Sequence, residues 1–185
     1  NGLMLQTGMK TRSLAVILLA LIGICTPYQR EIYTYEEYFR FYCRGYKLLT
    51  YVRSDHSNSH EDRKWEFRCD DSRLSLASIP RTCSWSGYVN NYDAPVVFKC
   101  GGNGFIQGIE SVHDNRYEDR RWSYYCCSSY KYKLTDCYFT SQLNQWDQTL
   151  QVWVRSGEVL RGVVSIHDDR KEDRIFWFEF CRLHI

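Results

Sequence analysis

The sequence has little proline (3 residues), little glycine (11 residues) and no strong excess of either charge, with 24 Lys and Arg against 22 Asp and Glu. The low proline and glycine exclude a collagen-like or low-complexity chain, and 16% aromatic residues exclude a disordered tail. A formal charge of +2 is too small for a nucleic-acid-binding protein that works by mass electrostatics. The chain also lacks an Asn-x-Ser/Thr sequon, a Gly-x-Ser-x-Gly motif, a phosphate-binding glycine loop and His-Glu-x-x-His. We therefore expect no N-glycosylation, no cofactor and no enzymatic activity.

Long hydrophobic runs are also missing, apart from residues 14–24, which follow the basic residues Lys10 and Arg12. A membrane-spanning helix needs about 20 apolar residues, whereas a charged stretch followed by a short apolar run is typical of a secretory signal peptide. We expect residues 1–26 to comprise upstream residues and a signal peptide that is removed. Removal of Cys25 leaves an even number of cysteines, as a closed disulfide set in a secreted protein requires. The sequence therefore predicts a secreted, extracellular chain with no membrane span.

A unit is repeated three times. Each copy contains Glu-Asp-Arg, and the Asp residues lie 57 and 54 positions apart. A histidine lies six residues before each Asp, an aromatic residue lies three after it, and a cysteine closes each unit. Six matched columns in three copies indicate a triplicated unit, with repeats at about 40–69, 97–127 and 151–182. The matched residues are His56, Glu61, Asp62, Arg63, Trp65 and Cys69; His113, Glu118, Asp119, Arg120, Trp122 and Cys126; and His167, Glu172, Asp173, Arg174, Phe176 and Cys181.

Each unit reads as a strand, a polar loop and a second strand. Residues 105–111 alternate, residues 122–125 and 176–180 are aromatic-rich, and the polar stretch between them is rich in turn formers. We predict a single all-β domain over residues 27–185, β-prism-like and stapled by disulfides, with a β-trefoil as the alternative. The columns that contain Trp65, Trp122 and Phe176 should face a shared core, and the polar tips should be exposed on loops.

The cysteine spacing predicts the disulfide pairing only in part. Cys43 to Cys69 and Cys100 to Cys126 each span 26 residues, which favours these two bridges. Cys126 and Cys127 are adjacent on a strand, where their side chains point to opposite faces, so they should take different partners. This leaves two pairings open: Cys100–Cys126 with Cys83–Cys127, or Cys100–Cys127 with Cys83–Cys126. Cys137 and Cys181 then pair with each other. No Cys-x-x-Cys pair is present and the expected compartment is oxidising, so we expect no metal–thiolate site. His56, His113 and His167 should be equivalent loop positions far apart, so we expect no metal site formed by them either.

The stretches Asp62-Arg63-Lys64-Trp65-Glu66-Phe67-Arg68-Cys69 and 119–127 resemble the Asp-Arg-x-Trp-x-aromatic-x-Cys signature of the dermatopontin family. The adjacent cysteine pair, the triplication and the 15 tyrosines are similar as well. This resemblance implies a secreted extracellular-matrix protein. Vertebrate members are implied to bind proteoglycans and collagen and to support cell adhesion, and invertebrate members to act as agglutinins, aggregation factors or shell-matrix components. Two departures are the shifted Trp177 of the third unit and the absence of a cysteine beyond Cys181.

The tips have two interpretations. Asp and Arg side chains can brace each hairpin through charge-assisted hydrogen bonds, or each tip with its aromatic neighbour can bind a sugar, which would give three sites and avidity. In addition, Tyr33, Tyr35 and Tyr38 lie among acidic residues, which suits tyrosine sulfation or, alternatively, an aromatic packing segment. The leading hypothesis is a secreted adhesive protein that binds glycans, glycosaminoglycans or proteoglycans and bridges cells or matrix. The alternative is a structural protein that binds collagen, other matrix proteins or cell-surface receptors without a sugar site.

Overall fold

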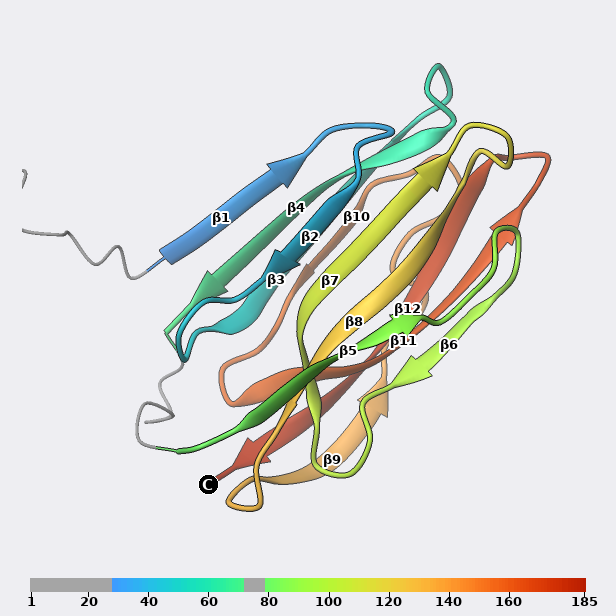
Figure 1. The fold of residues 1–185 in the computed structure, drawn as a ribbon. Coiled ribbons are helices and arrows are strands. Elements are labelled where there is room, and N and C mark those ends of the chain that lie inside the picture. Colours follow the sequence, from blue (N-terminus) through green and yellow to red (C-terminus); the bar gives the residue numbers. More distant parts are fainter. Residues whose placement is uncertain (1–27, 72–78) are drawn as a thin grey trace, which may run out of the picture.

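A computed structural model describes residues 28–71 and 79–185, so the predicted signal peptide lies outside the described residues. The all-β prediction is confirmed: the described chain forms three four-stranded antiparallel sheets, which are compatible with a prism (Figure 1). We call them sheet A (β1-β4-β3-β10), sheet B (β2-β7-β8-β5) and sheet C (β6-β11-β12-β9). In the part of the chain described, no helix is long and apolar enough to cross a membrane. The strands are β1 (Tyr28–Tyr33), β2 (Phe39–Tyr42), β3 (Leu48–Ser57), β4 (Asp62–Asp70), β5 (Thr82–Tyr88), β6 (Val96–Lys99), β7 (Phe105–Asp114), β8 (Asp119–Ser128), β9 (Lys133–Phe139), β10 (Leu150–Trp153), β11 (Glu158–Asp168) and β12 (Asp173–His184).

Each unit donates one strand to a neighbouring sheet. Strand β2 precedes the β3–β4 hairpin of sheet A but pairs with β7 of sheet B. Strand β6 likewise pairs with β11 of sheet C, and β10 pairs with β3 of sheet A, which closes the cycle. The structural unit is therefore four strands long and exceeds the sequence repeat. Because no unit completes a sheet by itself, we expect the three to fold together.

A bulge in the central hairpins lets the donated strands approach closely. The pairing register shifts at the same place in all three hairpins. A Cβ atom at Gly108 would lie 2.5 Å from the carbonyl oxygen of Phe41, and one at Gly162 would lie 2.9 Å from that of Phe98. Both contacts are with a donated strand, so a side chain at Gly108 or Gly162 would force that strand to shift. The equivalent position in the first unit is Tyr51, which lies opposite Trp153 of β10.

The repeated aromatic column forms the centre of the core, as expected. Trp65, Trp122 and Phe176 are almost fully buried, and their ring centroids lie 5.0, 5.5 and 5.9 Å apart in edge-to-face pairs. Edge-to-face packing of this kind adds to the free energy gained by burying the rings. In the third unit Phe176 fills the Trp position, whereas Trp177, paired with Val164, belongs to the opposite face of the strand. The aromatic column is therefore the contact through which the three units share one core.

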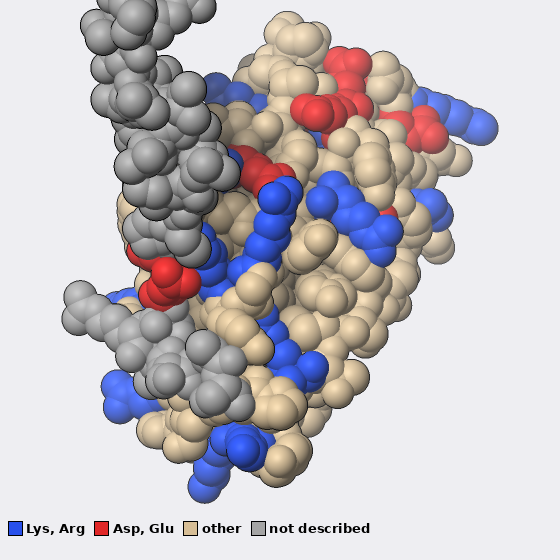
Figure 2. All heavy atoms as spheres, turned by 60° about the vertical axis from the view of Figure 1, so that its left-hand side comes forward, with Lys and Arg blue, Asp and Glu red and all other residues tan. Residues whose placement is uncertain are grey.

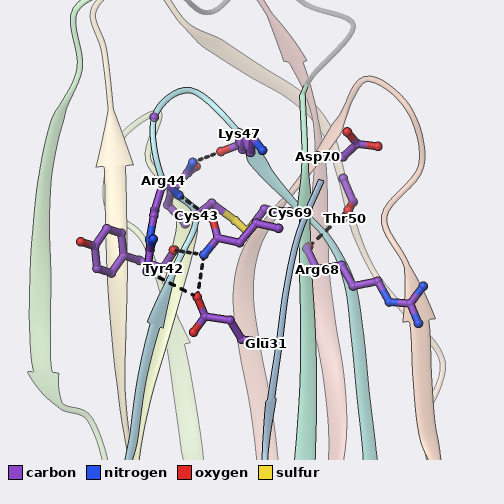
Figure 3. The surroundings of a disulfide bond; sticks show 12 residues. Glu31, Tyr42, Cys43, Arg44, Lys47, Thr50, Arg68, Cys69 and Asp70 are labelled. Carbon is purple, nitrogen blue, oxygen red and sulfur yellow. Dashed lines mark hydrogen bonds and ion pairs between the residues drawn. A yellow bond between two sulfur atoms is a disulfide. The ribbon is translucent and has the colours of Figure 1, made fainter. Parts of the chain in front are cut away.

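Four disulfides fall into two kinds. Two of them join the residue after a donated strand to the hairpin of the sheet that the strand has left, and two link neighbouring strands within a sheet. Figure 3 shows the first kind, in which Cys43 follows β2 and reaches Cys69 of β4. Of the two orders left open by the sequence, the structure has the one in which Cys126 pairs with Cys100. The bridges are Cys43–Cys69, Cys100–Cys126, Cys83–Cys127 and Cys137–Cys181.

Cys181 is the counterpart of Cys127, and its alignment with Cys69 and Cys126 in the sequence repeat was wrong. Both Cys127 and Cys181 bridge within a sheet over 44 residues. The true counterpart of Cys126 in the third unit is Phe180, and Val154 stands where the other units have their first cysteine. Phe180 belongs to the main apolar cluster, and the partly buried Val154 packs against it. Apolar packing thus replaces the third bridge between sheets.

Replacing Cys100 and Cys126 together by Ser should lower the free energy of unfolding by about 3.5 kcal/mol, because the unfolded chain regains the entropy of an open loop. Urea denaturation under non-reducing conditions measures this loss. Replacing Cys83 and Cys127, which close a longer loop, should cost slightly more. A double variant as stable as the unmodified chain would contradict the expectation.

Candidate functional site

The three polar tips meet at one end of the molecule. The turns that join β3 to β4, β7 to β8 and β11 to β12 lie together at the upper end of Figure 1. Asp62, Asp119 and Asp173 are 5% exposed or less, as are the arginines that follow them. The expectation of exposed tips was therefore wrong for the Asp and Arg residues, which lie together, whereas turn residues such as Asn58, Asn115 and Asp169 are exposed. A single repeat cannot show that its Asp and Arg will be covered by the other two units.

The aspartates and arginines of the tips form a closed ring of ion pairs. Each guanidinium donates two hydrogen bonds, from Nε and Nη2, to the carboxylate of another unit. Because each arginine pairs with a different unit, the ring links all three hairpins. The pairs are Arg63 with Asp173 (2.6 and 2.8 Å), Arg120 with Asp62 (2.7 and 2.7 Å) and Arg174 with Asp119 (2.6 and 2.7 Å). The bracing interpretation of these residues thus applies between the hairpins and not within them.

The loops before the donated strands complete this ring. The backbone N–H groups of Glu36, Asp93 and Asp147 donate to the three aspartates at 2.7–2.8 Å. All three loop residues have positive φ angles, between 59° and 61°. Residues other than glycine adopt this left-handed conformation only uncommonly, and the hydrogen bond to the ring holds each loop in it. The ring therefore fixes the entry of β2, β6 and β10 into their sheets.

The glutamates of the repeat lie around a small cavity at the ring. Glu61, Glu118 and Glu172 line it together with the ring residues and the aromatic column, and its volume is about 20 Å³. Burial raises the pKa of Glu118 and Glu172 above the ordinary value, and repulsion from neighbouring carboxylates, Glu61 among them, adds to the rise. A cavity of this size has room for about one water molecule. It is too small for a sugar ring, so we do not place glycan recognition at the tips.

The three repeated histidines are buried behind the ring. The exposed fraction of their side chains is 1% or less. His56 Nδ1 lies 3.3 Å from Asp173 Oδ1, whereas in His113 and His167 the same atom lies 3.2 and 3.3 Å from the side-chain oxygen of the residue two positions later. The histidines therefore contact the ring and the turns from within the fold.

The outward face of sheet A gathers basic and aromatic side chains. Figure 2 views the side of the molecule on which sheet A lies and shows basic side chains spread between uncharged ones along it. The Arg68 guanidinium lies 4.3 Å over the ring of Tyr51 and 5.4 Å from that of Trp153, which is 57% exposed. We call this surface the basic-aromatic face. It comprises Tyr28, Arg30, Tyr51, Arg53, Lys64, Arg68 and Trp153.

Two carboxylates lie beneath these cations. Glu66 accepts hydrogen bonds from Arg30 and Arg68, each at 2.6 Å, and Asp55 accepts from Arg53. Burial alone would raise the pKa of both carboxyl groups, but the hydrogen bonds outweigh it and hold each pKa below the ordinary value. The carboxylates are less exposed than the cations that they hold. The basic groups are therefore fixed in position with their outer sides open to solvent.

The corresponding faces of the other two sheets are different. Sheet B presents mostly tyrosine, with Arg40 stacked 4.5 Å over Trp85 and Arg121 4.3 Å over Tyr88. Sheet C presents apolar side chains, among which Val97 is 76% and Phe139 52% exposed. The ring and core are threefold, whereas the outer faces have diverged. We call the sheet B surface the tyrosine face; it comprises Tyr38, Tyr42, Trp85, Tyr88 and Tyr125.

The basic-aromatic face was missed from the sequence. Its signal is the alternation of Tyr51, Arg53 and Asp55 along one strand and of Lys64, Glu66 and Arg68 along the next. The sequence alone does not show which residues of β1 and β10 lie beside them, because that depends on pairing between strands far apart in the chain.

The three tyrosines considered for sulfation have different environments. Tyr33 stacks on Phe39 and donates a hydrogen bond to Glu31. Tyr35 stacks on His60 at 4.6 Å. Tyr38 is 51% exposed and its hydroxyl donates to Glu110 at 2.7 Å. Sulfation stays a prediction, and Tyr38 is the most accessible of the three positions.

Together these features define a class of protein: a disulfide-bridged all-β chain in which three interlocked units surround an Asp–Arg ring. The chain belongs to the dermatopontin family, whose profile matches residues 33–185. It is 36% identical over 170 residues to a hemagglutinin/amebocyte aggregation factor of Limulus polyphemus, covering 90% of this chain and 95% of that protein. It is 35% identical to a dermatopontin of Biomphalaria glabrata (78% and 94% covered) and 30% identical to Millepora cytotoxin-1 of Millepora dichotoma (84% and 68% covered). No solved structure matches the chain.

Removing one ring partner should destabilise the fold strongly. Asp62→Ala leaves the buried Arg120 guanidinium without its carboxylate, and we expect a loss of about 3–5 kcal/mol in the free energy of unfolding. The double variant Asp62→Leu/Arg120→Met removes both charges and should lose less. Urea denaturation followed by tryptophan fluorescence compares the two, with the exposed Lys64→Ala as the control. If Asp62→Ala unfolded at the same urea concentration as the unmodified chain, the ring would not be the constraint described.

Acid should weaken the ring in a defined pH window. Burial alone would raise the pKa of Asp173. The hydrogen bonds from His56 and Arg63 and the charge of Arg63 outweigh this effect and lower the pKa from 3.8 to about 2. Because the folded-state pKa is depressed, this stabilisation is present above about pH 4 and is lost as the pH falls towards 2, and it amounts to about 2 kcal/mol. Urea midpoints measured between these pH values should fall for the unmodified chain and fall less for Asp173→Asn. Equal slopes would contradict the assignment.

Proposed function

We propose that this protein is a secreted adhesive protein of the extracellular matrix or body fluid, and that its basic-aromatic face binds sulfated glycosaminoglycans. The observation that carries the proposal is the interleaving of four cations with three aromatic rings on one sheet. The relationship to an aggregation factor and a dermatopontin supports the adhesive role. The four disulfides suit an oxidising, extracellular environment.

The chemistry of the face suits an anionic polysaccharide. Guanidinium groups bind sulfate and carboxylate through paired hydrogen bonds, while an exposed ring such as Trp153 offers an apolar surface to the C–H side of a sugar. A groove of about 240 Å³ runs between Arg30, Arg53 and Lys64 and can take such groups. The four cations outnumber the three carboxylates, Glu66, Asp55 and Asp70, so the face is locally positive although the chain as a whole is near neutral.

Bridging requires a second contact surface. Because the three outer faces differ, we do not propose three equivalent glycan sites. The tyrosine face supports the alternative function, binding of collagen or another matrix protein, because exposed tyrosine and stacked arginine are enriched in protein interfaces. Tyr42 and Tyr88 are 47% and 43% exposed there. A protein with one polysaccharide face and one protein face would connect the two kinds of matrix polymer.

The glycan proposal is tested on immobilised heparin and dermatan sulfate with the disulfide-intact chain. Arg53→Gln/Lys64→Gln removes two exposed cations from the groove and should elute at clearly lower salt, since binding to a polyanion depends on the number of cations engaged. The matched control is Lys131→Gln/Lys133→Gln, which makes the same charge change on exposed residues of sheet C and its preceding turn and should elute close to the unmodified chain.

Two outcomes would overturn the glycan proposal: no retention of the unmodified chain at physiological salt, or equal shifts for the two double variants. Retention on a collagen column that survives the groove variant but is lost in Tyr42→Ser/Tyr88→Ser would instead favour the alternative function. Agglutination of cells, blocked by soluble sulfated glycosaminoglycan, is the expected activity of the intact protein.

A further inference from the structure

A second cluster of functional groups lies between the loop before β6 and the turn that joins β11 to β12. Asp93 belongs to the loop, and His167 and Asp169 belong to the hairpin. One ligand atom from each residue lies within 4.8 Å of the other two. We propose that Asp93, His167 and Asp169 form a binding site for a divalent transition metal such as Zn²⁺.

The spacing of the atoms suits such an ion. His167 Nδ1 lies 3.3 Å from Asp169 Oδ1 and 3.8 Å from Asp93 Oδ1. Zinc binds nitrogen and oxygen ligands at about 2.0–2.2 Å in a tetrahedron, so its ligand atoms stand about 3.4 Å apart. Only small side-chain movements are therefore needed to close the three ligands around one ion.

His167 is held in the orientation that a metal ligand needs. Its side chain is 1% exposed, and Nδ1 faces the two aspartates. On the opposite side of the ring, Nε2 lies 3.6 Å from Glu172 Oε2 and 4.0 Å from Asp119 Oδ1, without a hydrogen-bond partner among the described residues. Carboxylates behind the second nitrogen are a common arrangement for metal-binding histidines, because they fix the tautomer and make the ligating nitrogen more basic.

Asp93 is held in place by the ring. Its backbone N–H donates to Asp119 Oδ2 at 2.8 Å and its φ angle is 61°. Burial and the neighbouring carboxylates of Asp119 and Asp169 raise the pKa of Asp93 above the ordinary value, and a bound cation would relieve this repulsion. The carboxylates remain accessible, since Asp93 is 40% and Asp169 80% exposed, which leaves open coordination positions for water.

The second unit provides an internal comparison. There, Glu36 takes the place of Asp93, and Asn115 takes the place of Asp169 beside His113. The Asn115 amide donates a hydrogen bond to Glu36 at 3.4 Å, so this pair is satisfied without an ion. The Asp169 side chain has no N–H to donate, and two carboxylates face one another instead. The sequence repeat alone could not show the site, because Asp93 comes from a different unit.

The test uses the tag-free, disulfide-intact chain and titration with Zn²⁺ by isothermal calorimetry. We expect one saturable site, and Asp169→Asn, which reproduces the second unit, should weaken its affinity by more than tenfold, the scale of loss seen even for residues behind the ligands. Asp136→Asn makes the same change on the exposed β9 and should bind as the unmodified chain does. Conversely, Asn115→Asp should add a second equivalent of bound metal.

Three results would overturn the proposal: no saturable Zn²⁺ binding, equal affinity in Asp169→Asn and the unmodified chain, or tighter binding of Ca²⁺ than of Zn²⁺, which would indicate a site of oxygen ligands alone. Urea denaturation of each variant without metal checks the fold. Because Asp169 is largely exposed, its replacement should leave stability unchanged within about 0.5 kcal/mol. Zn²⁺-dependent displacement of the His167 imidazole signals in NMR spectra confirms the ligand directly.

Discussion

The buried ring of three Asp–Arg pairs is the constraint that organises this molecule. An isolated buried charge is costly, whereas a bidentate pair with its other hydrogen bonds satisfied is tolerated. Each of Asp62, Asp119 and Asp173 therefore needs an arginine from another unit and a backbone N–H from a loop. Two hairpins and the loop before a donated strand must be in place before any one pair is complete, and all three units before the ring is closed. The aromatic column beneath the ring is assembled by the same step.

This arrangement separates structural residues from the candidate binding residues. The residues that repeat in all three units form the ring, the column and the buried histidines, and they leave little room for a ligand. The features that distinguish one face from another lie where the units differ. Sheet A carries cations and rings, sheet B carries tyrosines, and sheet C carries apolar side chains. Repetition here serves assembly, and recognition depends on departures from it.

The positions at which the three units differ share one feature: a side chain changes while the backbone stays the same. A third bridge between sheets is replaced by Val154 and Phe180 in the core, so covalent linkage and apolar packing substitute for each other. Likewise Asn115 satisfies Glu36 with a hydrogen bond, where Asp169 meets Asp93 with like charge. In each case the backbone is shared and a single side chain changes the chemistry. The dermatopontin family scaffold therefore has positions that can acquire a new function without loss of the ring.

Patterns within the sequence repeats predict the strand type, the number of units and the pairing of Cys43 with Cys69, because alternation and loop length are local properties of the chain. They do not predict which residue forms an ion pair with each charged side chain. Arg63 pairs with Asp173, 110 residues away, and β2 pairs with β7 rather than with its own hairpin. Repeated residues look identical in sequence whether they act separately or together. Only the closure of three units around an axis decides that the Asp and Arg residues of the tips are buried against one another, and which side chains the outward faces of the sheets bring together.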